Sequence, residues 1–338
     1  MSQHASAVTP DLFWQTMSAF QQSAALKSAV ELEIFTHIGA GKASATEIAE
    51  ASGASERGVR ILCDVLTIIG FLTKDSGNYQ LTESTAAFLD KRSPMYVGSA
   101  VEFILSPAQR RGYDELTNAV RNGGSSVSGD ASMDPESEMW VNFARNMAPM
   151  MFPGAQMLAE HIGFETDRQL KVLDIAAGHG IYGIMVAKKY PNAQIYGADW
   201  NKVLAVAKEN AEKLGVADRY HTIPGNAFDS DFGTDFDVIL IPNFLHHFDM
   251  PTCKSFLRKV NGALADSGKV LTVEFVPNDD RVSPPPSAMF SLVMLAATPG
   301  GDAYTFAELK QMFENAGFSQ NEIVALQPMP QHLIISTR

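Results

Sequence analysis

The amino-acid sequence predicts a doubly wound α/β sheet with an antiparallel last strand in its C-terminal half, preceded by a mostly helical region. Short apolar stretches alternate with helical segments after residue 170, and a glycine-bearing turn follows the first of them. Helix-start signals and a hairpin pattern occupy the first 95 residues. Alternating strands and helices predict a parallel sheet covered on both faces. Because parallel crossovers are right-handed, such a sheet is doubly wound.

A winged-helix pattern accounts for residues 1–95. Ser44 and Glu47 form a capping box, Ser55 caps the next helix, and Gly70 ends it. Lys and Arg number seven here and Asp and Glu ten, too few cations for several phosphate contacts, so dimerisation or packing is favoured over DNA binding. We expect helices at 11–39, from 44 and from 55, and strands at 71–73 and 79–81.

Residues 96–165 predict a helical linker interrupted by a loop at 123–130. After this loop, apolar residues recur at helical spacing. This face lines either the protein core or a substrate pocket, and the sequence leaves both interpretations open. The face consists of Trp140, Phe143, Met147, Met150 and Met151.

The remaining residues, 166–338, predict the sheet itself. Thr305 and Glu308 form a second capping box. A short connection joins the last two strands, so they form an antiparallel pair at the sheet edge. The expected strands lie at 172–176, 194–198, 219–224, 236–241, 269–275, 322–326 and 332–336.

Composition restricts the classes of function. The 338 residues have a formal net charge of −12, which disfavours nucleic acids and membranes as partners. Cys63 and Cys253 lack metal-ligand spacing, and no cluster of Asp, Glu and His supplies it, so no metal is expected. The start of the chain lacks signal-peptide features, and no apolar stretch is long enough to cross a bilayer. A cytoplasmic protein is expected.

A candidate cofactor site lies in the turn Asp174-Ile-Ala-Ala-Gly-His-Gly180. Gly178 and Gly180 lack Cβ atoms, so backbone there approaches a ligand closely. Asp199 ends the next strand, where a carboxylate accepts hydrogen bonds from ribose hydroxyls. With Ala176 as its first position, the turn departs from the dinucleotide pattern G-x-G-x-x-G. The Asp174 carboxylate suits a zwitterionic, sulfonium-bearing ligand better than a pyrophosphate.

This turn resembles the first motif of class I methyltransferases. Nearly the whole chain is similar to the two-domain, S-adenosylmethionine-dependent small-molecule O-methyltransferases, such as the caffeate and acetylserotonin enzymes and bacterial natural-product tailoring enzymes. The resemblance implies a Rossmann-like methyltransferase sheet, a winged-helix dimerisation domain, a homodimer and S-adenosylmethionine as cofactor. The cofactor-binding residues that it implies are Asp174, Ala176, Gly178, Gly180, Asp199, Trp200, Asn226, Ala227, Phe228 and Asn243.

The segment Asn243-Phe-Leu-His-His-Phe-Asp249 is similar to the family segment that supplies a catalytic histidine. The resemblance implies that His246 is the general base, that Glu274 orients it, and that His247 replaces an aspartate. The family's second orienting glutamate is replaced by Ala303, with Asp302 adjacent; Asp249 is an alternative catalytic carboxylate. The residues expected at the substrate are Phe143, Met147, Met150, His247, Met289 and Phe290.

These observations predict methyl transfer to a hydroxyl of a small, aromatic or polyketide-like metabolite. Three alternatives stay open: transfer to carbon or nitrogen, or other chemistry on the same scaffold; a cofactor-sensing DNA regulator; and a nicotinamide oxidoreductase.

Overall fold

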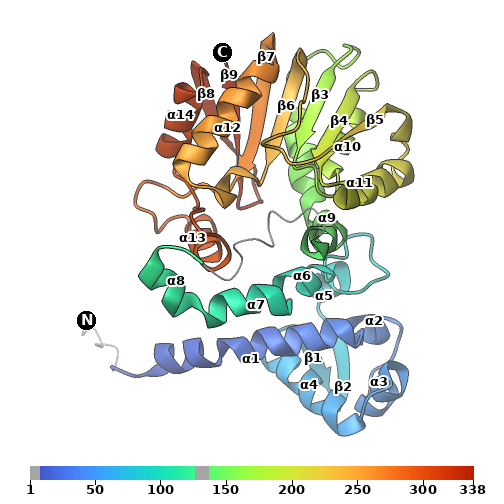
Figure 1. The fold of residues 1–338 in the computed structure, drawn as a ribbon. Helices are drawn as coiled ribbons and strands as arrows, with labels where there is room; N and C mark the ends of the chain where they lie inside the picture. Colours follow the sequence, from blue (N-terminus) through green and yellow to red (C-terminus); the bar gives the residue numbers. More distant parts are fainter. Residues whose placement is uncertain (1–7, 126–136) are drawn as a thin grey trace, which may run out of the picture. The chain divides into compact units, whose positions relative to one another are not determined.

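The computed structural model describes residues 8–125 and 137–338. The chain divides into two compact units, Met1–Leu105 and Ser106–Arg338, which are described separately (Figure 1). Residues 126–130 of the expected loop lie outside the described part. The finer division into 1–95, 96–165 and 166–338 stays a prediction.

The first unit combines helices with a two-stranded hairpin. The single helix expected at 11–39 is wrong, because the chain breaks at Glu33, which has a left-handed φ of 53°. Ile34 and Phe35 follow the break and are fully buried, so core packing overrides helix propensity there. The capping box at Ser44 is confirmed. The elements are α1 (Asp11–Glu31), α2 (Ile34–Gly39), α3 (Ala45–Ser52), α4 (Glu56–Ile68), β1 (Leu72–Asp75), β2 (Asn78–Leu81), α5 (Glu83–Phe88) and α6 (Ala100–Ile104).

The second unit begins with helices α7 (Pro107–Asp114), α8 (Leu116–Asn122) and α9 (Glu138–Glu160). Strands and helices then alternate as expected. They are β3 (Lys171–Ile175), α10 (Ile181–Lys189), β4 (Gln194–Asp199), α11 (Asn201–Lys213), the 3-10 turn η1 (Ala217–Arg219), β5 (Tyr220–Pro224), β6 (Phe236–Pro242), the 3-10 turn η2 (Leu245–His247), α12 (Met250–Ala263), β7 (Leu264–Glu274), α13 (Pro285–Ala297), α14 (Phe306–Asn315), β8 (Gln320–Ala325) and β9 (His332–Thr337).

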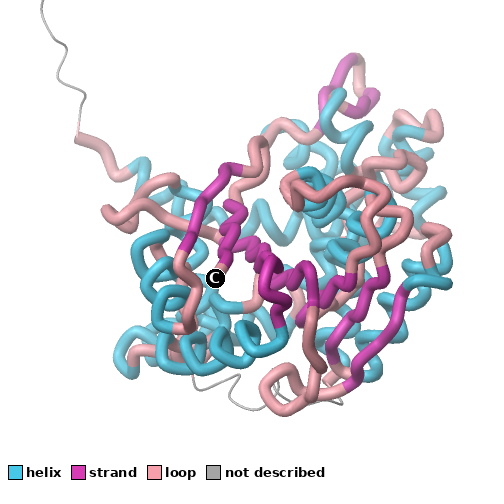
Figure 2. Tube along the Cα trace, turned by 90° about the horizontal axis from the view of Figure 1, so that it is seen from above, coloured by secondary structure: helices cyan, strands magenta, loops and turns pink. Residues whose placement is uncertain are grey.

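A seven-stranded sheet forms the centre of this unit, in the order β5-β4-β3-β6-β7-β9-β8. The first five strands in this order run parallel, and β9 runs antiparallel to both β7 and β8. Figure 2 shows the strands as a twisted row with helices on both sides. The predicted doubly wound fold with its antiparallel ending is therefore confirmed.

Helices outside the sheet complete the unit. Helix α9 packs against α10 and α11, and α13 packs against α7 and α8. The Thr305 capping box opens α14 as predicted. Across the described ranges, no helix combines the length and apolar character needed to cross a membrane.

Candidate active site

Four polar residues lie at the carboxyl ends of neighbouring strands. Asp174 is near the end of β3, Asp199 ends β4, Asn243 directly follows β6, and Glu274 ends β7. The strand order reverses direction between β3 and β6. In open α/β sheets, ligands bind in the crevice at such a switch point. The structure therefore brings the predicted cofactor carboxylates and the predicted catalytic glutamate to one edge of the sheet.

The Asp174 carboxylate is fully buried beneath the start of α10. Its Oδ2 accepts the Gly183 N–H at 3.0 Å, while Oδ1 has no hydrogen-bond partner. Burial, and secondarily the charge of Asp199, raises the pKa of Asp174 to about 8. Asn243 Oδ1 is also buried without a partner. Two unpaired oxygens at the ends of adjacent strands form an acceptor site for a donor-rich cation, such as an ammonium group.

Asp199 holds the turn that follows β3. Its Oδ2 accepts the Gly178 N–H at 2.8 Å, and its Oδ1 accepts the Trp200 N–H at 2.6 Å. Burial raises the pKa of Asp199 to about 6, although these two hydrogen bonds oppose the shift. Ala176 has a φ of 51°, Gly178 a φ of 56° and Gly180 a φ of 73°, so this turn is left-handed at three positions.

Gly183 and Gly180 are small for packing reasons within the protein. A Cβ atom at Gly183 would lie 2.6 Å from Ile195 and 2.9 Å from Asp174 Oδ2. Read from Gly178, the segment Gly178-His-Gly-Ile-Tyr-Gly183 fits G-x-G-x-x-G, so the departure seen from Ala176 does not by itself distinguish the two kinds of nucleotide cofactor. A Cβ atom at Gly180 would lie 2.8 Å from the Tyr220 hydroxyl and 2.9 Å from Ala207 Cβ. Packing against Tyr220 and Ala207 is therefore enough to explain why residue 180 is a glycine, without a bound ligand.

Gly180→Ala is expected to destabilise the chain more than Gly215→Ala. Both glycines have a φ of 73°, but a Cβ atom at Gly215 meets nothing within 4 Å. The shared backbone cost is about 1–2 kcal/mol, and overpacking at Gly180 adds about 1–3 kcal/mol. Urea denaturation of both variants measures the difference. Equal losses of stability would contradict the packing role assigned to Gly180.

Asp174 is expected to contribute stability to the ligand-free chain that is lost as the pH rises from about 4 to 8. Asp174 keeps its proton in the folded state up to a pKa of about 8, whereas an unfolded Asp releases its proton near about 4. Protons are therefore released on unfolding in this window, and stability present at low pH is lost as the pH rises. The slope is on the order of 1 kcal/mol per pH unit. Denaturation at several pH values should show that the unfolding free energy of wild type, relative to that of Asp174→Asn, falls across this window; a constant difference would refute this assignment.

His246 and Glu274 form a buried pair. The His246 ring Nδ1 lies 2.5 Å from Glu274 Oε2, and the two residues are 4% and 3% exposed. Glu274 Oε1 accepts the backbone N–H groups of Phe244 (3.1 Å), Leu245 (2.8 Å) and His246 (3.4 Å). With Nδ1–H donating to the carboxylate, His246 Nε2 has a free lone pair. One carboxylate therefore shapes the turn η2 and sets the histidine tautomer.

The other candidate carboxylates have different partners. Asp249 caps α12 by accepting the Thr252 N–H at 2.8 Å, so the local fold explains it without a catalytic role. Asp302 pairs with Arg281 at 3.4 Å and is substantially exposed. A role for Asp302 in place of the missing second glutamate therefore stays a prediction. Ala303 is fully buried.

A continuous series of rings, here called the ring series, links His246 to the turn after β3. Its members are Phe290, His246, His247, Trp140, Phe143, His179 and Tyr182. Successive ring centroids are 4.9, 4.3, 5.4, 5.8, 6.2 and 6.2 Å apart. Burial and the neighbouring His246 lower the pKa of His247 well below its ordinary value. The ring series therefore combines aromatic faces with the neutral imidazole of His247.

The ring series contains three of the predicted substrate residues: Phe143, His247 and Phe290. Phe290 also stacks on Phe275 at 3.9 Å. Met147 is buried on α9 and Met150 is half-buried. Met289 is 68% exposed, unlike its neighbour Phe290. Their contact with substrate stays a prediction.

The predicted adenine-side residues are held by local contacts. Asn226 Oδ1 accepts the Phe228 N–H at 2.9 Å. The carbonyls of Ala227 and Phe228 accept hydrogen bonds from Lys259, and the Phe228 ring packs against Phe244, Phe248 and Phe256. Trp200 packs against a cluster that contains Ala144 of α9. Their contact with cofactor stays a prediction.

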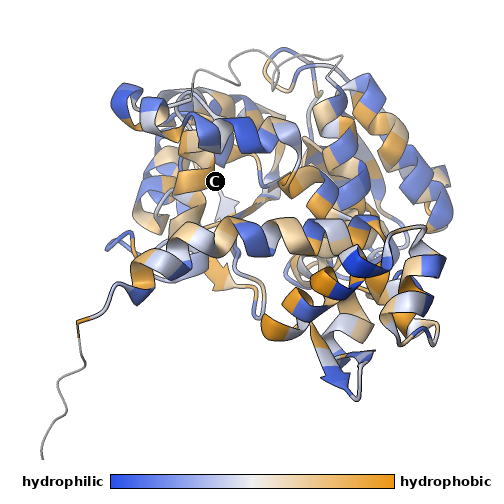
Figure 3. Ribbon diagram, turned by 90° about the horizontal axis from the view of Figure 1, so that it is seen from below, coloured by the Kyte–Doolittle hydropathy of each residue, from blue (hydrophilic) through white to orange (hydrophobic). Residues whose placement is uncertain are grey.

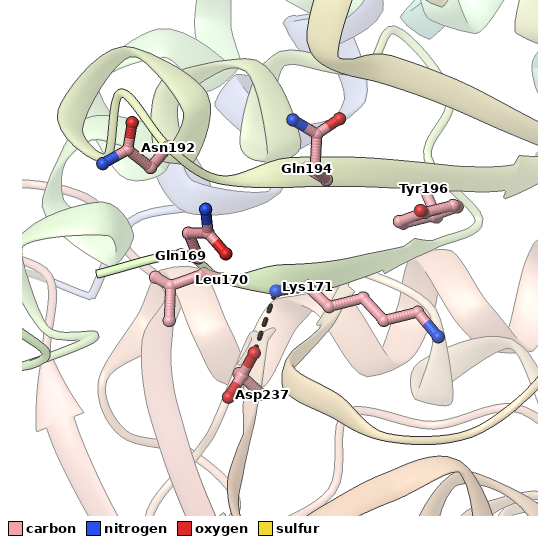
Figure 4. A pocket seen from close by; sticks show the side chains of 7 residues that line it. All are labelled: Gln169, Leu170, Lys171, Asn192, Gln194, Tyr196 and Asp237. Atoms are coloured by element: carbon pink, nitrogen blue, oxygen red, sulfur yellow. Dashed lines mark hydrogen bonds between the residues drawn. The ribbon is translucent and has the colours of Figure 1, made fainter. Parts of the chain in front are cut away.

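A separate hollow of about 410 Å³ lies at the amino ends of the strands (Figure 4). Lys171 and Gln194 begin β3 and β4, so this hollow is at the opposite edge of the sheet from Asp174 and Asp199. It therefore takes no part in the candidate site. In the described ranges, no cluster of three or more His, Cys, Asp or Glu side chains is arranged to hold a metal.

Three residues of the site were missed at the level of sequence. His179 lies between two glycines of the turn, a position that could have drawn attention to it. Tyr182 follows three residues later, but its contact with the Met151 sulfur at 3.9 Å is tertiary. Tyr220 is 6% exposed with an unpartnered hydroxyl, and no local signal reveals its approach to Gly180.

Comparison with known proteins identifies the family. The model of the O-methyltransferase domain matches residues 114–319, and that of the O-methyltransferase dimerisation domain matches residues 14–91. A 3-hydroxy-5-methyl-1-naphthoate 3-O-methyltransferase from Streptomyces sahachiroi is 26% identical over 314 residues, covering 92% of this chain and 90% of the relative.

Solved structures agree with this assignment. A protein from Nostoc punctiforme, provisionally described as an O-methyltransferase, is 52% identical with a TM-score of 0.94, covering 98% of this chain and 100% of that one. Human N-acetylserotonin methyltransferase, solved in complex with S-adenosylmethionine, shares the fold at 19% identity and a TM-score of 0.84, covering 100% and 99%. The chain therefore belongs to the family of two-domain, S-adenosylmethionine-dependent O-methyltransferases.

Proposed function

We propose that this enzyme methylates a hydroxyl group of a small, planar aromatic metabolite, with His246 as the general base. The observation that supports this most directly is the buried pair of His246 and Glu274 beside the ring series. The series runs from this pair to the turn held by Asp199. The proposed base, the aromatic rings and the cofactor turn are thus connected by successive ring contacts within the second unit.

The residues at the carboxyl edge fit S-adenosylmethionine. The unpaired Asp174 Oδ1 and Asn243 Oδ1 match the donors of an amino-acid ammonium group. Asp199 holds Gly178 through one oxygen and retains lone pairs for ribose hydroxyls. When bound, the cofactor supplies a methyl group on a sulfonium, which leaves as a neutral thioether.

His246 takes the proton of the acceptor hydroxyl, which would make the acceptor oxygen reactive toward the methyl group that the bound cofactor supplies. Nε2 accepts this proton because Nδ1–H already donates to Glu274 Oε2. The imidazolium that forms is stabilised by the adjacent carboxylate, whose other oxygen is held by three backbone N–H groups. The pair stays buried, so its geometry is set before the acceptor arrives.

The acceptor class follows from the lining and from relatives. The ring series offers aromatic faces and neutral imidazoles, which stack on a planar ring and donate hydrogen bonds to its oxygens. Relatives with 26% identity include the naphthoate enzyme named above and a tetracenomycin polyketide 8-O-methyltransferase from Streptomyces glaucescens. We therefore propose an aromatic, polyketide-like hydroxyl compound as acceptor.

We also propose that the enzyme is a homodimer. The dimerisation-domain match covers residues 14–91. Helix α1 exposes large apolar side chains, and apolar stretches are visible along it in Figure 3. Such a patch on a helix marks a protein interface. The exposed residues are Leu12, Phe13, Trp14, Met17 and Phe20.

Calorimetric titration with S-adenosylhomocysteine tests the cofactor site, with NADH as the control ligand. Wild type is expected to bind S-adenosylhomocysteine and not NADH. Asp199→Ala is expected to lose about 100-fold in affinity, because two turn N–H groups and the ribose hydroxyls lose their acceptor. The proposal is refuted if folded wild type binds NADH but not S-adenosylhomocysteine. Incubation with labelled S-adenosylmethionine and 3-hydroxy-1-naphthoic acid, followed by mass analysis, then tests O-methylation.

A further inference from the structure

His179 is a buried ring in the middle of the cofactor turn, and the proposed function uses it only as a member of the ring series. The residue is 4% exposed and lies between Gly178 and Gly180. Burying an imidazole is costly unless its polar atoms have partners. Its position therefore requires an explanation from its contacts.

The edge of the His179 ring holds the turn to the start of α10. Nδ1 accepts the Ile181 N–H at 3.1 Å, and the His179 carbonyl accepts Asn210 Nδ2 at 2.9 Å. An accepting ring nitrogen has no proton, so the neutral tautomer has its proton on Nε2. Burial lowers the pKa of His179 to about 4, which keeps the ring neutral near pH 7.

The faces of the same ring connect two helices. Phe143 of α9 stacks at 6.2 Å with an interplanar angle of 21°, and Tyr182 of α10 stacks at 6.2 Å and 26°. Phe143 also lies close to Gly178, since a Cβ atom there would be 3.7 Å from the Phe143 ring. Helix α9 therefore touches the cofactor turn through Phe143, which lies against the His179 ring and the Gly178 backbone.

We propose that His179 is a positioning residue that couples occupation of the cofactor site to the placement of α9, the helix that faces the acceptor. The inference rests on the proposed function, because it takes the turn after β3 as the cofactor turn. A ligand held by Gly178 and Asp199 orders this turn. Nδ1 fixes the His179 ring to the turn, and Phe143 stacks on this ring. A more ordered turn therefore restricts the motion of Phe143 and of α9.

Two substitutions of His179 test the hydrogen bond at the ring edge and the stacking on the ring faces separately. His179→Asn keeps an acceptor for the Ile181 N–H, because an Asn side chain bonds the backbone two residues on, but it removes the stacking surface. His179→Phe keeps the stacking surface and leaves the Ile181 N–H without its acceptor. Phe143→Ala removes the α9 partner, and His221→Asn is a control at an exposed histidine of β5.

Hydrogen–deuterium exchange of α9 amides, with and without saturating S-adenosylhomocysteine, tests the coupling without an acceptor. In wild type and His221→Asn, the ligand is expected to slow exchange in the first half of α9 by up to about tenfold, the scale of one lost aromatic contact. His179→Asn should bind the ligand within about threefold of wild type yet lose this protection, as should Phe143→Ala. His179→Phe should bind the ligand more weakly but regain protection at saturation.

Full α9 protection in ligand-saturated His179→Asn would overturn the inference, as would ligand-bound wild type without α9 protection. Neither result affects the proposed function, which depends on binding and methyl transfer. Failure of folded wild type to bind S-adenosylhomocysteine would instead overturn the proposed function and the inference together.

Discussion

Glu274→Gln is expected to lower kcat by about 10³–10⁴-fold while leaving the chain folded. The glutamine oxygen still accepts the three backbone N–H groups that fix Oε1, so the turn η2 keeps its shape. The amide nitrogen then faces His246 and donates to Nδ1. This reverses the hydrogen bond and moves the ring proton to Nε2, where the lone pair is needed.

Steady-state kinetics with a saturating acceptor measures this loss, and circular dichroism checks the fold. Glu322→Gln on the exposed edge strand β8 is the matched control, because it makes the same chemical change far along the sheet order from β3 and β4. If Glu274→Gln kept kcat within tenfold of wild type, the carboxylate would be structural and the tautomer argument would fail.

His246→Ala should reduce kcat by about 10²–10⁴-fold, the usual contribution of a general base. Affinity for S-adenosylhomocysteine should stay unchanged, because the Asp174 and Asp199 contacts do not involve His246. Added imidazole should restore part of the rate by occupying the vacated space and accepting the proton.

Single-turnover assays with and without imidazole separate the chemical step from binding, and His221→Ala serves as a control at an exposed histidine. Loss of cofactor affinity in parallel with kcat would show that the substitution disturbs the turn η2 and its surroundings rather than removing a base. A rate equal to that of wild type would remove His246 from the mechanism.

The sequence predicted the elements whose causes are local. The capping boxes at Ser44 and Thr305 are confirmed, since their hydrogen bonds join residues three apart. The strands are confirmed because continuous apolar runs bounded by turns favour buried strands. The break at Glu33 was not predicted, because helix propensity continues through it and only the burial of Ile34 and Phe35 explains the change of direction.

The candidate site likewise contains features that could be predicted from the sequence and features that depend on tertiary contacts. The hydrogen bond between His246 and Glu274 follows from the resemblance, and the fold places both residues at strand ends. The ring series joins α9, α10, α13 and two loops, so no local pattern reveals it. Asp302 stood next to the missing glutamate in the sequence, but its partner Arg281 comes from a separate loop. Tertiary contacts decide such cases.

The reversal of strand order between β3 and β6 has an evolutionary consequence. One half of the sheet, β5-β4-β3, presents Asp174 and Asp199, while the other half presents His246 and Glu274. Under the proposed function, mutations on α13 or on the acceptor-facing side of α9 alter the acceptor's contacts and spare Asp174 and Asp199. Related enzymes with this fold can therefore change their acceptor by single substitutions while the cofactor carboxylates stay the same. His179 lies between the two groups of residues.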